Sequence, residues 1–205
     1  MPVATKIFPN SIGITGSPAT GKKTIGHELS NITGLEFLSL NDFAIVNRLG
    51  TQSQGDREFI VDIPRLRKQI MAITKGKIVS GHLLPYVVPG SKLDFVAVLR
   101  CSPAVLCKRY MKRNYPPNKL RENLEAEMIG VIAGESLRVY GKQKLAEFDT
   151  TRTKNPQTIA KRILHAISEK GGRSFGYIDW LTSSTPAMLE RMGFLDASAA
   201  EHQKG

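Results

Sequence analysis

A glycine-rich loop between an apolar run and a helical stretch constrains this chain more than any other feature of its sequence. The loop is Gly16-Ser17-Pro18-Ala19-Thr20-Gly21-Lys22, which has the G-x-x-x-x-G-K spacing and follows the apolar residues 11–15. Two glycines allow a tight turn in which successive N–H groups point into one concavity, and the following helix N-terminus adds partial positive charge. The loop therefore predicts a phosphate-binding site in which Lys22 reaches the β and γ phosphates of a nucleotide.

The position after Lys22 departs from this motif. A Ser or Thr ordinarily stands there to hold Mg²⁺, whereas this chain has Lys23. Thr24 carries a hydroxyl one residue later, but one residue rotates a side chain by about 100° around a helix. The loop thus indicates nucleotide binding, and it leaves the metal chemistry open.

Length, hydropathy and cysteine content bound the class of protein. A chain of 205 residues is long enough for one well-buried domain with a small insertion. Its apolar runs, such as residues 95–99, are far shorter than the ~20 residues of a membrane span, and we expect a cytoplasmic protein with no membrane association. Cys101 and Cys107 are the only cysteines, without a nearby His or Cys cluster, and this argues against a disulfide framework or a zinc site.

The positive charge is concentrated in the second half of the chain. The formal net charge is +11, and residues 100–173 hold sixteen Lys and Arg against seven Asp and Glu. A nucleotide needs only a few cations, so the excess suggests a second polyanionic partner such as RNA. A solvated basic surface without a partner is the alternative.

Predicted strands and helices alternate along most of the chain. Strands are expected at 11–15, 36–40, 77–80, 94–99 and 146–150, and helices at 22–33, 43–49, 64–76, 103–113, 119–139 and 156–170. Asn41 or Asp42 is expected to cap the second helix, and the polar residues 51–56 to form a loop. The alternation predicts an α/β fold, a doubly wound, five-stranded parallel sheet with its ligand at the carboxyl ends of the strands.

The composition changes after Gly171-Gly172. We expect one phosphate-loop domain over residues 1–172, followed by a C-terminal strap and tail over residues 173–205, whose apolar residues pack on the core.

Several segments together suggest a family. They are Gly16–Lys22, Leu40-Asn41-Asp42, and residues 59–62, 79–82, 96–100 and 113–127. The last run, with its Asn-x-x-x-Glu spacing, is the most specific. Over about residues 11–170 the chain resembles adenylate kinase isoenzyme 6 in its archaeal form. The resemblance implies a small nucleoside monophosphate kinase-like protein of the P-loop NTPase class, with a monophosphate-binding segment at about 42–75 and a short lid at about 113–126.

The resemblance also implies activities and partners. Its members are described as having adenylate kinase activity, in which ATP and AMP give two ADP, together with ATPase activity. They are linked to maturation of the small ribosomal subunit through a ribosomal protein and the nearby rRNA. ATP, AMP or a related monophosphate, and possible ribosomal partners are therefore expected.

The same resemblance assigns roles to individual residues. Arg109 and Arg113 would lie over the transferring phosphoryl group, although each could simply be a cation on a helix surface. Asp42 and Asp62 would border the second nucleotide, with a helix cap as the alternative for Asp42. The loop residues that would wrap or adjoin the phosphates of ATP are Gly16, Ser17, Ala19, Thr20, Gly21, Lys22, Lys23 and Thr24.

Ser80-Gly81-His82 stands where the family has an acid, one residue and a histidine. The histidine, which would orient a water molecule or couple the site to motion, is present as His82. Ser80 stands in place of the acid that would hold the water shell of Mg²⁺. With Lys23, both usual magnesium anchors are altered. One hypothesis is that Lys23 partly stands in for the cation, with slow turnover; the other is that Asp42 or Asp94 supplies the missing carboxylate and magnesium-dependent catalysis survives.

Two classes of function remain open at this point. The first is an enzyme that phosphorylates a nucleoside monophosphate, with kinases of other small acceptors as a variant. The second is an assembly factor whose nucleotide site acts as a switch, and whose basic half binds a ribosomal protein or rRNA.

Overall fold

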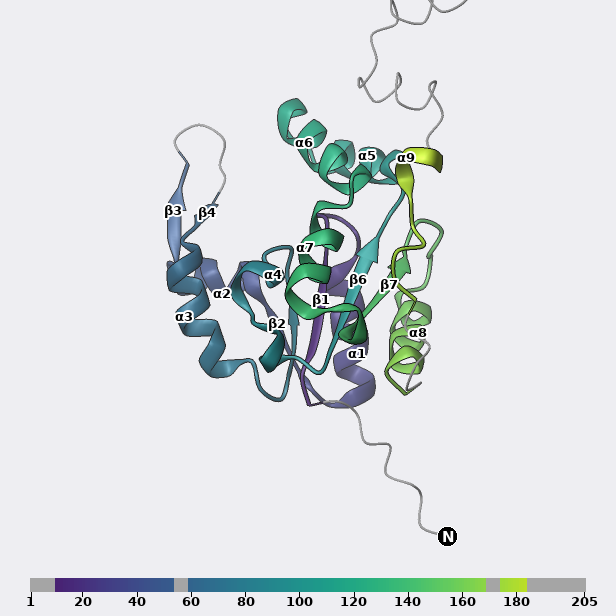
Figure 1. Cartoon of the computed structure of the whole chain (residues 1–205). Helices are drawn as coiled ribbons and strands as arrows, with labels where there is room; N and C mark the ends of the chain where they lie inside the picture. Colours follow the sequence, from purple (N-terminus) through teal and green to yellow (C-terminus); the bar gives the residue numbers. More distant parts are fainter. Residues whose placement is uncertain (1–9, 54–58, 169–173, 184–205) are drawn as a thin grey trace, which may run out of the picture.

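A five-stranded parallel sheet forms the centre of the molecule (Figure 1). The computed structural model describes residues 10–53, 59–168 and 174–183. The strand order is β2-β5-β1-β6-β7, in which the strands are β1 (Ile12–Gly16), β2 (Glu36–Ser39), β5 (Lys77–Ser80), β6 (Phe95–Arg100) and β7 (Leu145–Asp149). Each neighbouring pair is parallel, which confirms the predicted doubly wound fold.

Helices cover both faces of the sheet. On one face, Ile12 and Ile14 of β1 pack in a buried cluster with α1 (Lys22–Thr33) and α8 (Pro156–Ser168). The other face carries a second cluster with residues from α2 (Leu40–Val46), α3 (Ile63–Ile73), α4 (Leu84–Val87) and α7 (Val131–Tyr140). Shorter 3₁₀ turns, η1 (Gly90–Lys92) and η2 (Lys142–Lys144), precede β6 and β7. The apolar residues of β1 and β6 are buried on both faces, as a central parallel strand requires.

The predicted helix at 119–139 is wrong, because the chain forms two helices there. Gly130 has a φ of +69°, a left-handed conformation that a glycine adopts without steric cost. It separates α6 (Pro117–Met128) from α7, and α6 projects with α5 (Pro103–Lys112) above the carboxyl ends of the strands (Figure 1). The predicted lid segment therefore lies over the end of the sheet where ligands bind in this class of fold.

Two local predictions near residue 50 are also wrong. Ser39, and not Asn41 or Asp42, caps α2, since its side chain accepts a hydrogen bond from Asp42 N. Part of the expected loop at 51–56 is a strand: β3 (Gly50–Gln52) pairs with β4 (Phe59–Val61) in an antiparallel hairpin. Residues 54–58 lie outside the described residues.

Residues 174–183 run beside the edge strand β7 and end in α9 (Trp180–Ser183). Glu147 N donates to Ser174 O at 2.9 Å, and the Tyr177 hydroxyl donates to Glu147 O at 2.9 Å. These contacts cover part of an otherwise open sheet edge. The rest of the expected strap and tail lies outside the described residues, so the domain division stays a prediction. Within the described ranges, no helix is long and apolar enough to cross a membrane.

Replacing Tyr140 with phenylalanine tests the packing of α7 on α4. The buried Tyr140 hydroxyl lies 2.9 Å from Leu84 O and 3.0 Å from Val88 O. Without it these carbonyls lose their partner, and we expect Tyr140→Phe to lower the free energy of unfolding by about 1–3 kcal/mol in a urea titration. The partly exposed Tyr86 is the matched control. Tyr86→Phe should change the free energy of unfolding by less than about 0.5 kcal/mol. Equal losses in both variants would contradict this packing.

Candidate functional site

The loop between β1 and α1 adopts a conformation that its sequence makes possible. Gly16 has a φ of +134°, and a Cβ there would overlap the carbonyl group of Leu99 on the neighbouring strand. Ala19 has a φ of +60°, which is uncommon for a residue with a side chain and costs about 1 kcal/mol. A strained residue of this kind persists only where surrounding contacts hold it in place.

Those contacts are hydrogen bonds to four consecutive loop residues. The Ser17 hydroxyl donates to Glu127 Oε2 at 2.6 Å, and the Tyr110 hydroxyl donates to Pro18 O at 2.9 Å. Arg109 Nη1 donates to Ala19 O at 2.8 Å, and Thr150 Oγ1 to Thr20 O at 3.1 Å. The partners come from α5, α6 and the end of β7. They fix the outer side of the loop from residue 17 to residue 20.

Glu127 joins the loop to a buried network of charges. Its Oε1 accepts from Arg100 Nε at 2.8 Å, from Cys101 N at 3.1 Å and from Trp180 Nε1 at 3.0 Å. Arg100 Nη1 also donates to Glu147 at 2.9 Å, and these three charged residues are each less than 5% exposed. Removing one member of such a buried group leaves an uncompensated charge, which costs about 3–5 kcal/mol. The loop is therefore anchored to β6, β7 and α6 at once.

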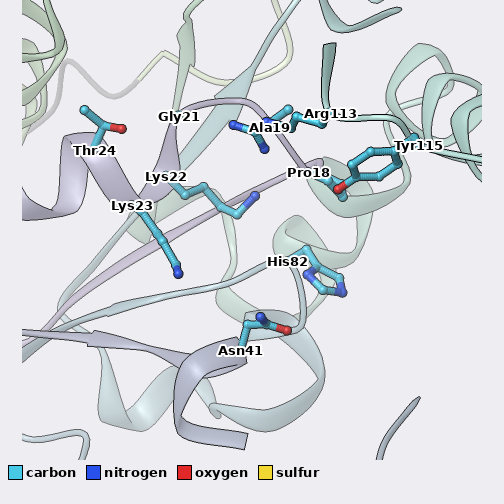
Figure 2. Close-up of a pocket in the computed structure, with 10 residues that line it drawn as sticks. All are labelled: Pro18, Ala19, Gly21, Lys22, Lys23, Thr24, Asn41, His82, Arg113 and Tyr115. Atoms are coloured by element: carbon cyan, nitrogen blue, oxygen red, sulfur yellow. The ribbon is translucent and has the colours of Figure 1, made fainter. Parts of the chain in front are cut away.

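A cavity of about 270 Å³ opens on the inner side of the loop. Figure 2 shows the Lys22 side chain directed toward His82, the Lys23 side chain directed toward Asn41, and Arg113 entering from the end of α5. The complete lining is Pro18, Ala19, Gly21, Lys22, Lys23, Thr24, Asn41, His82, Arg113 and Tyr115. Three of these side chains are cationic and none is acidic, so the cavity suits an anion.

Burial sets the protonation of two groups in this cavity. Burial, opposed by the charge of Glu127 and assisted by that of Arg113, lowers the pKa of Lys22 to about 7. The Lys22 ammonium group contacts the carbonyl oxygens of Gly16 at 3.0 Å and Ser17 at 2.8 Å. Burial and the charges of Lys22 and Lys119 lower the pKa of His82 to about 4. His82 is therefore a neutral imidazole at pH 7, with one ring nitrogen able to accept a hydrogen bond.

A second cavity, of about 520 Å³, adjoins the first at the same loop. It shares Ala19, Gly21, Thr24 and Arg113 with the first cavity, and it adds Arg109, Lys112, Thr153, Lys154 and Pro156 among its lining residues. One extended ligand could thus occupy both cavities and place its anionic part on the loop between them.

The structure brings most of the expected site residues together and separates others. Of the expected residues, those that line the first cavity are Ala19, Gly21, Lys22, Lys23, Thr24, His82 and Arg113. Thr20 lines only the second cavity, and Gly16 and Ser17 line neither of the two. Arg109 faces the second cavity and holds the loop by Ala19 O. Asp42 pairs with Lys23 at 2.7 Å, and Asp62 caps α3 by accepting from Arg65 N at 3.0 Å. Their proposed roles toward substrate stay predictions.

Asp94 cannot supply the missing carboxylate. Its Oδ2 accepts from Ser11 N at 3.0 Å, before the first residues of β1 and β6, so it lies at the opposite end of the sheet from the loop. Ser80 ends β5 and is 2% exposed. The two cysteines are free, and burial raises the pKa of the Cys101 thiol to about 11, so neither a disulfide nor a reactive thiolate is present there.

Sequence reasoning singled out Arg109, in another role, but missed the other residues that hold the loop. Tyr110 and Thr150 are remote from it in sequence and carry no local signal. Glu127 lies inside the run 113–127, and its acidic side chain on an otherwise apolar helix face, with Leu124 and Met128 also buried, is the signal that could have identified it.

Comparisons with known proteins agree with this geometry. A family model described as an AAA domain matches residues 12–130. The chain is 34% identical over 171 residues to a protein of Thermococcus kodakarensis described as "Putative adenylate kinase", covering 82% of this chain and 92% of that protein. A Methanocaldococcus jannaschii protein with the same description is 33% identical over 173 residues, with the same coverage of 82% and 92%.

Solved structures of kinases share the fold. Shikimate kinase from Acinetobacter baumannii in complex with shikimate has a TM-score of 0.55 at 16% identity, covering 83% of this chain and 98% of that chain. Shikimate kinase from Bacteroides thetaiotaomicron has a TM-score of 0.54 at 13% identity, covering 77% and 98%. At these identities the likeness establishes the P-loop kinase fold alone.

The lowered pKa of Lys22 predicts a measurable proton exchange. Above pH 7 the free amine dominates, and a bound triphosphate favours the ammonium form, so ATP binding at pH 8 should take up a proton and weaken as the pH rises from 7 to 9. Calorimetric titrations in two buffers with different ionisation enthalpies measure this uptake. Lys22→Arg stays protonated and should abolish it. Equal binding heats in the two buffers for the unaltered protein would contradict the assignment.

Proposed function

The chain belongs to the family of these archaeal adenylate kinase-like proteins, and from this premise we propose that it transfers the γ-phosphoryl group of ATP to AMP or a related monophosphate. The main support is the pair of cavities that meet at the anchored loop, with Arg113 lining both. One cavity would hold the donor's nucleoside and the other the site of transfer. The acceptor would enter beside α2, within the proposed monophosphate segment at 42–75.

The chemistry proposed for the site is electrostatic. An acceptor phosphate oxygen attacks the γ-phosphorus, the bond to the β-γ bridging oxygen breaks, and ADP leaves. Loop N–H groups, the Lys22 ammonium group and the Arg113 guanidinium group neutralise the charge on the transferring group. The neutral His82 would orient a water molecule for the slower hydrolysis of ATP.

The residues present do not fit the usual magnesium site of a phosphate-loop kinase. Mg²⁺ is ordinarily held by a loop Ser or Thr and an acid at the end of a neighbouring strand. Here these positions hold Lys23 and Ser80, and within the described residues no group of three or more His, Cys, Asp or Glu side chains could hold a metal ion. No step of the proposed reaction is therefore assigned to a metal.

The proposed resemblance to isoenzyme 6 supplies a second candidate function. In it the protein is a nucleotide-dependent assembly switch that binds small-subunit rRNA or a ribosomal protein. A third cavity, of about 600 Å³, adjoins the second and favours a polyanionic partner: the exposed Arg152, Lys154 and Arg162 line it, against the single carboxylate of Asp149. Cations in such an arrangement attract a phosphate backbone.

Phosphorus NMR of the full chain with ATP and AMP tests the leading proposal. We expect ADP to form only when both nucleotides are present, and Lys22→Ala to slow its formation by about a hundredfold or more, because one donor to the transferring group is lost. The same variant controls for contaminating kinases.

The products separate the two candidate functions. Free phosphate alone, or no turnover, would overturn the kinase proposal. The switch is supported instead if small-subunit RNA then binds with an affinity that depends on nucleotide and falls steeply with salt.

A further inference from the structure

Two successive lysines at the start of α1 line the first cavity, but they have different partners. Lys22 is bonded to loop carbonyls, whereas Lys23 Nζ lies 2.7 Å from Asp42 Oδ2. The side chains of Lys23 and Asp42 are 57% and 51% exposed. An ion pair this exposed contributes little to stability, so Lys23 can exchange Asp42 for a more highly charged partner at little cost.

The place of Lys23 in the loop gives that exchange a function. It occupies the position whose hydroxyl ordinarily binds Mg²⁺ beside the β and γ phosphates. Ser80, at the end of β5, supplies no carboxylate, and Asp42 is already neutralised by Lys23. Thr24 also lines this cavity, but Figure 2 shows its hydroxyl apart from the ends of Lys22 and His82.

We propose that Lys23 replaces the magnesium ion, so that this protein binds ATP without a divalent cation. When ATP arrives, the Lys23 ammonium group leaves Asp42 and forms charge-assisted hydrogen bonds with phosphate oxygens. Lys22, Lys23 and Arg113 then surround the triphosphate on the inner side of the loop (Figure 2). This inference rests on the proposed ATP site and adds that the Lys23 ammonium group, in place of Mg²⁺, neutralises the phosphates there.

Calorimetric titration of the full chain with ATP, in EDTA and in excess Mg²⁺, tests the inference without using turnover. For the unaltered protein the dissociation constants in the two buffers should agree within about threefold. Lys23→Thr should weaken binding in EDTA by about ten- to a hundredfold, because a hydrogen-bonded charge is lost. Added Mg²⁺ should restore its binding, since the new hydroxyl and the released Asp42 can serve the metal. Lys23→Arg should keep the binding in EDTA.

Two further variants complete the design. Lys161, exposed on α8 and outside the cavities described above, provides the charge-matched control, and Lys161→Thr should leave the affinity unchanged. Asp42→Asn removes the competing partner of Lys23 and should tighten binding in EDTA by about two- to fivefold.

The outcomes distinguish this inference from the proposed function. If ATP binds the unaltered protein only with Mg²⁺, or if Lys23→Thr binds ATP in EDTA as well as the unaltered protein does, the inference is overturned and the ATP site remains. If ATP binds in neither buffer, the proposed function is overturned, and the role of Lys23 with it.

Discussion

The hydrogen bonds that hold residues 17–20 from outside are the constraint on which the rest of the site depends. They come from α5, α6 and the end of β7, and the one from Glu127 continues into the buried charges of Arg100 and Glu147. A loop with a left-handed alanine would not keep this shape unaided. Because its outer side is occupied by these partners, the loop can present its inner side to a ligand.

The same network acts on the charge of Lys22 in the first cavity. On the outer side of the loop, the carboxylates of Glu127 and Glu147 pair with the Arg100 guanidinium group. The charge of Glu127 also partly offsets the effect of burial on the pKa of Lys22. On the inner side of the loop, the first cavity is lined by three cationic side chains and no acidic one. The arrangement favours binding of a polyanion, and Lys23 takes the position that a metal ligand has in related loops.

The sequence allowed prediction of the parts of the fold that depend on local pattern. The buried strands, α1 and the phosphate loop follow from apolar runs and glycine spacing. The break at Gly130 was not predicted, because a single glycine within an amphipathic pattern looks tolerable until its φ is known. The β3–β4 hairpin was missed because each strand has only three residues and β3, Gly50-Thr51-Gln52, lacks the apolar residues typical of a strand.

The partners of the site residues could not be predicted in the same way. Asp42 was expected near substrate or at a helix cap. Ser39 caps α2 instead, and the pairing of Asp42 with Lys23 on another helix was not foreseen. The contacts of Tyr110 and Thr150 with the loop span 92 and 130 residues. Such contacts between distant residues depend on the order of the strands in the sheet.

The most direct test of a loop held in place before nucleotide binds is ¹⁵N relaxation of the backbone amides of residues 16–22 in the nucleotide-free protein. Order parameters of about 0.85 are predicted, as in rigid backbone, and values below about 0.6 would contradict a preformed loop.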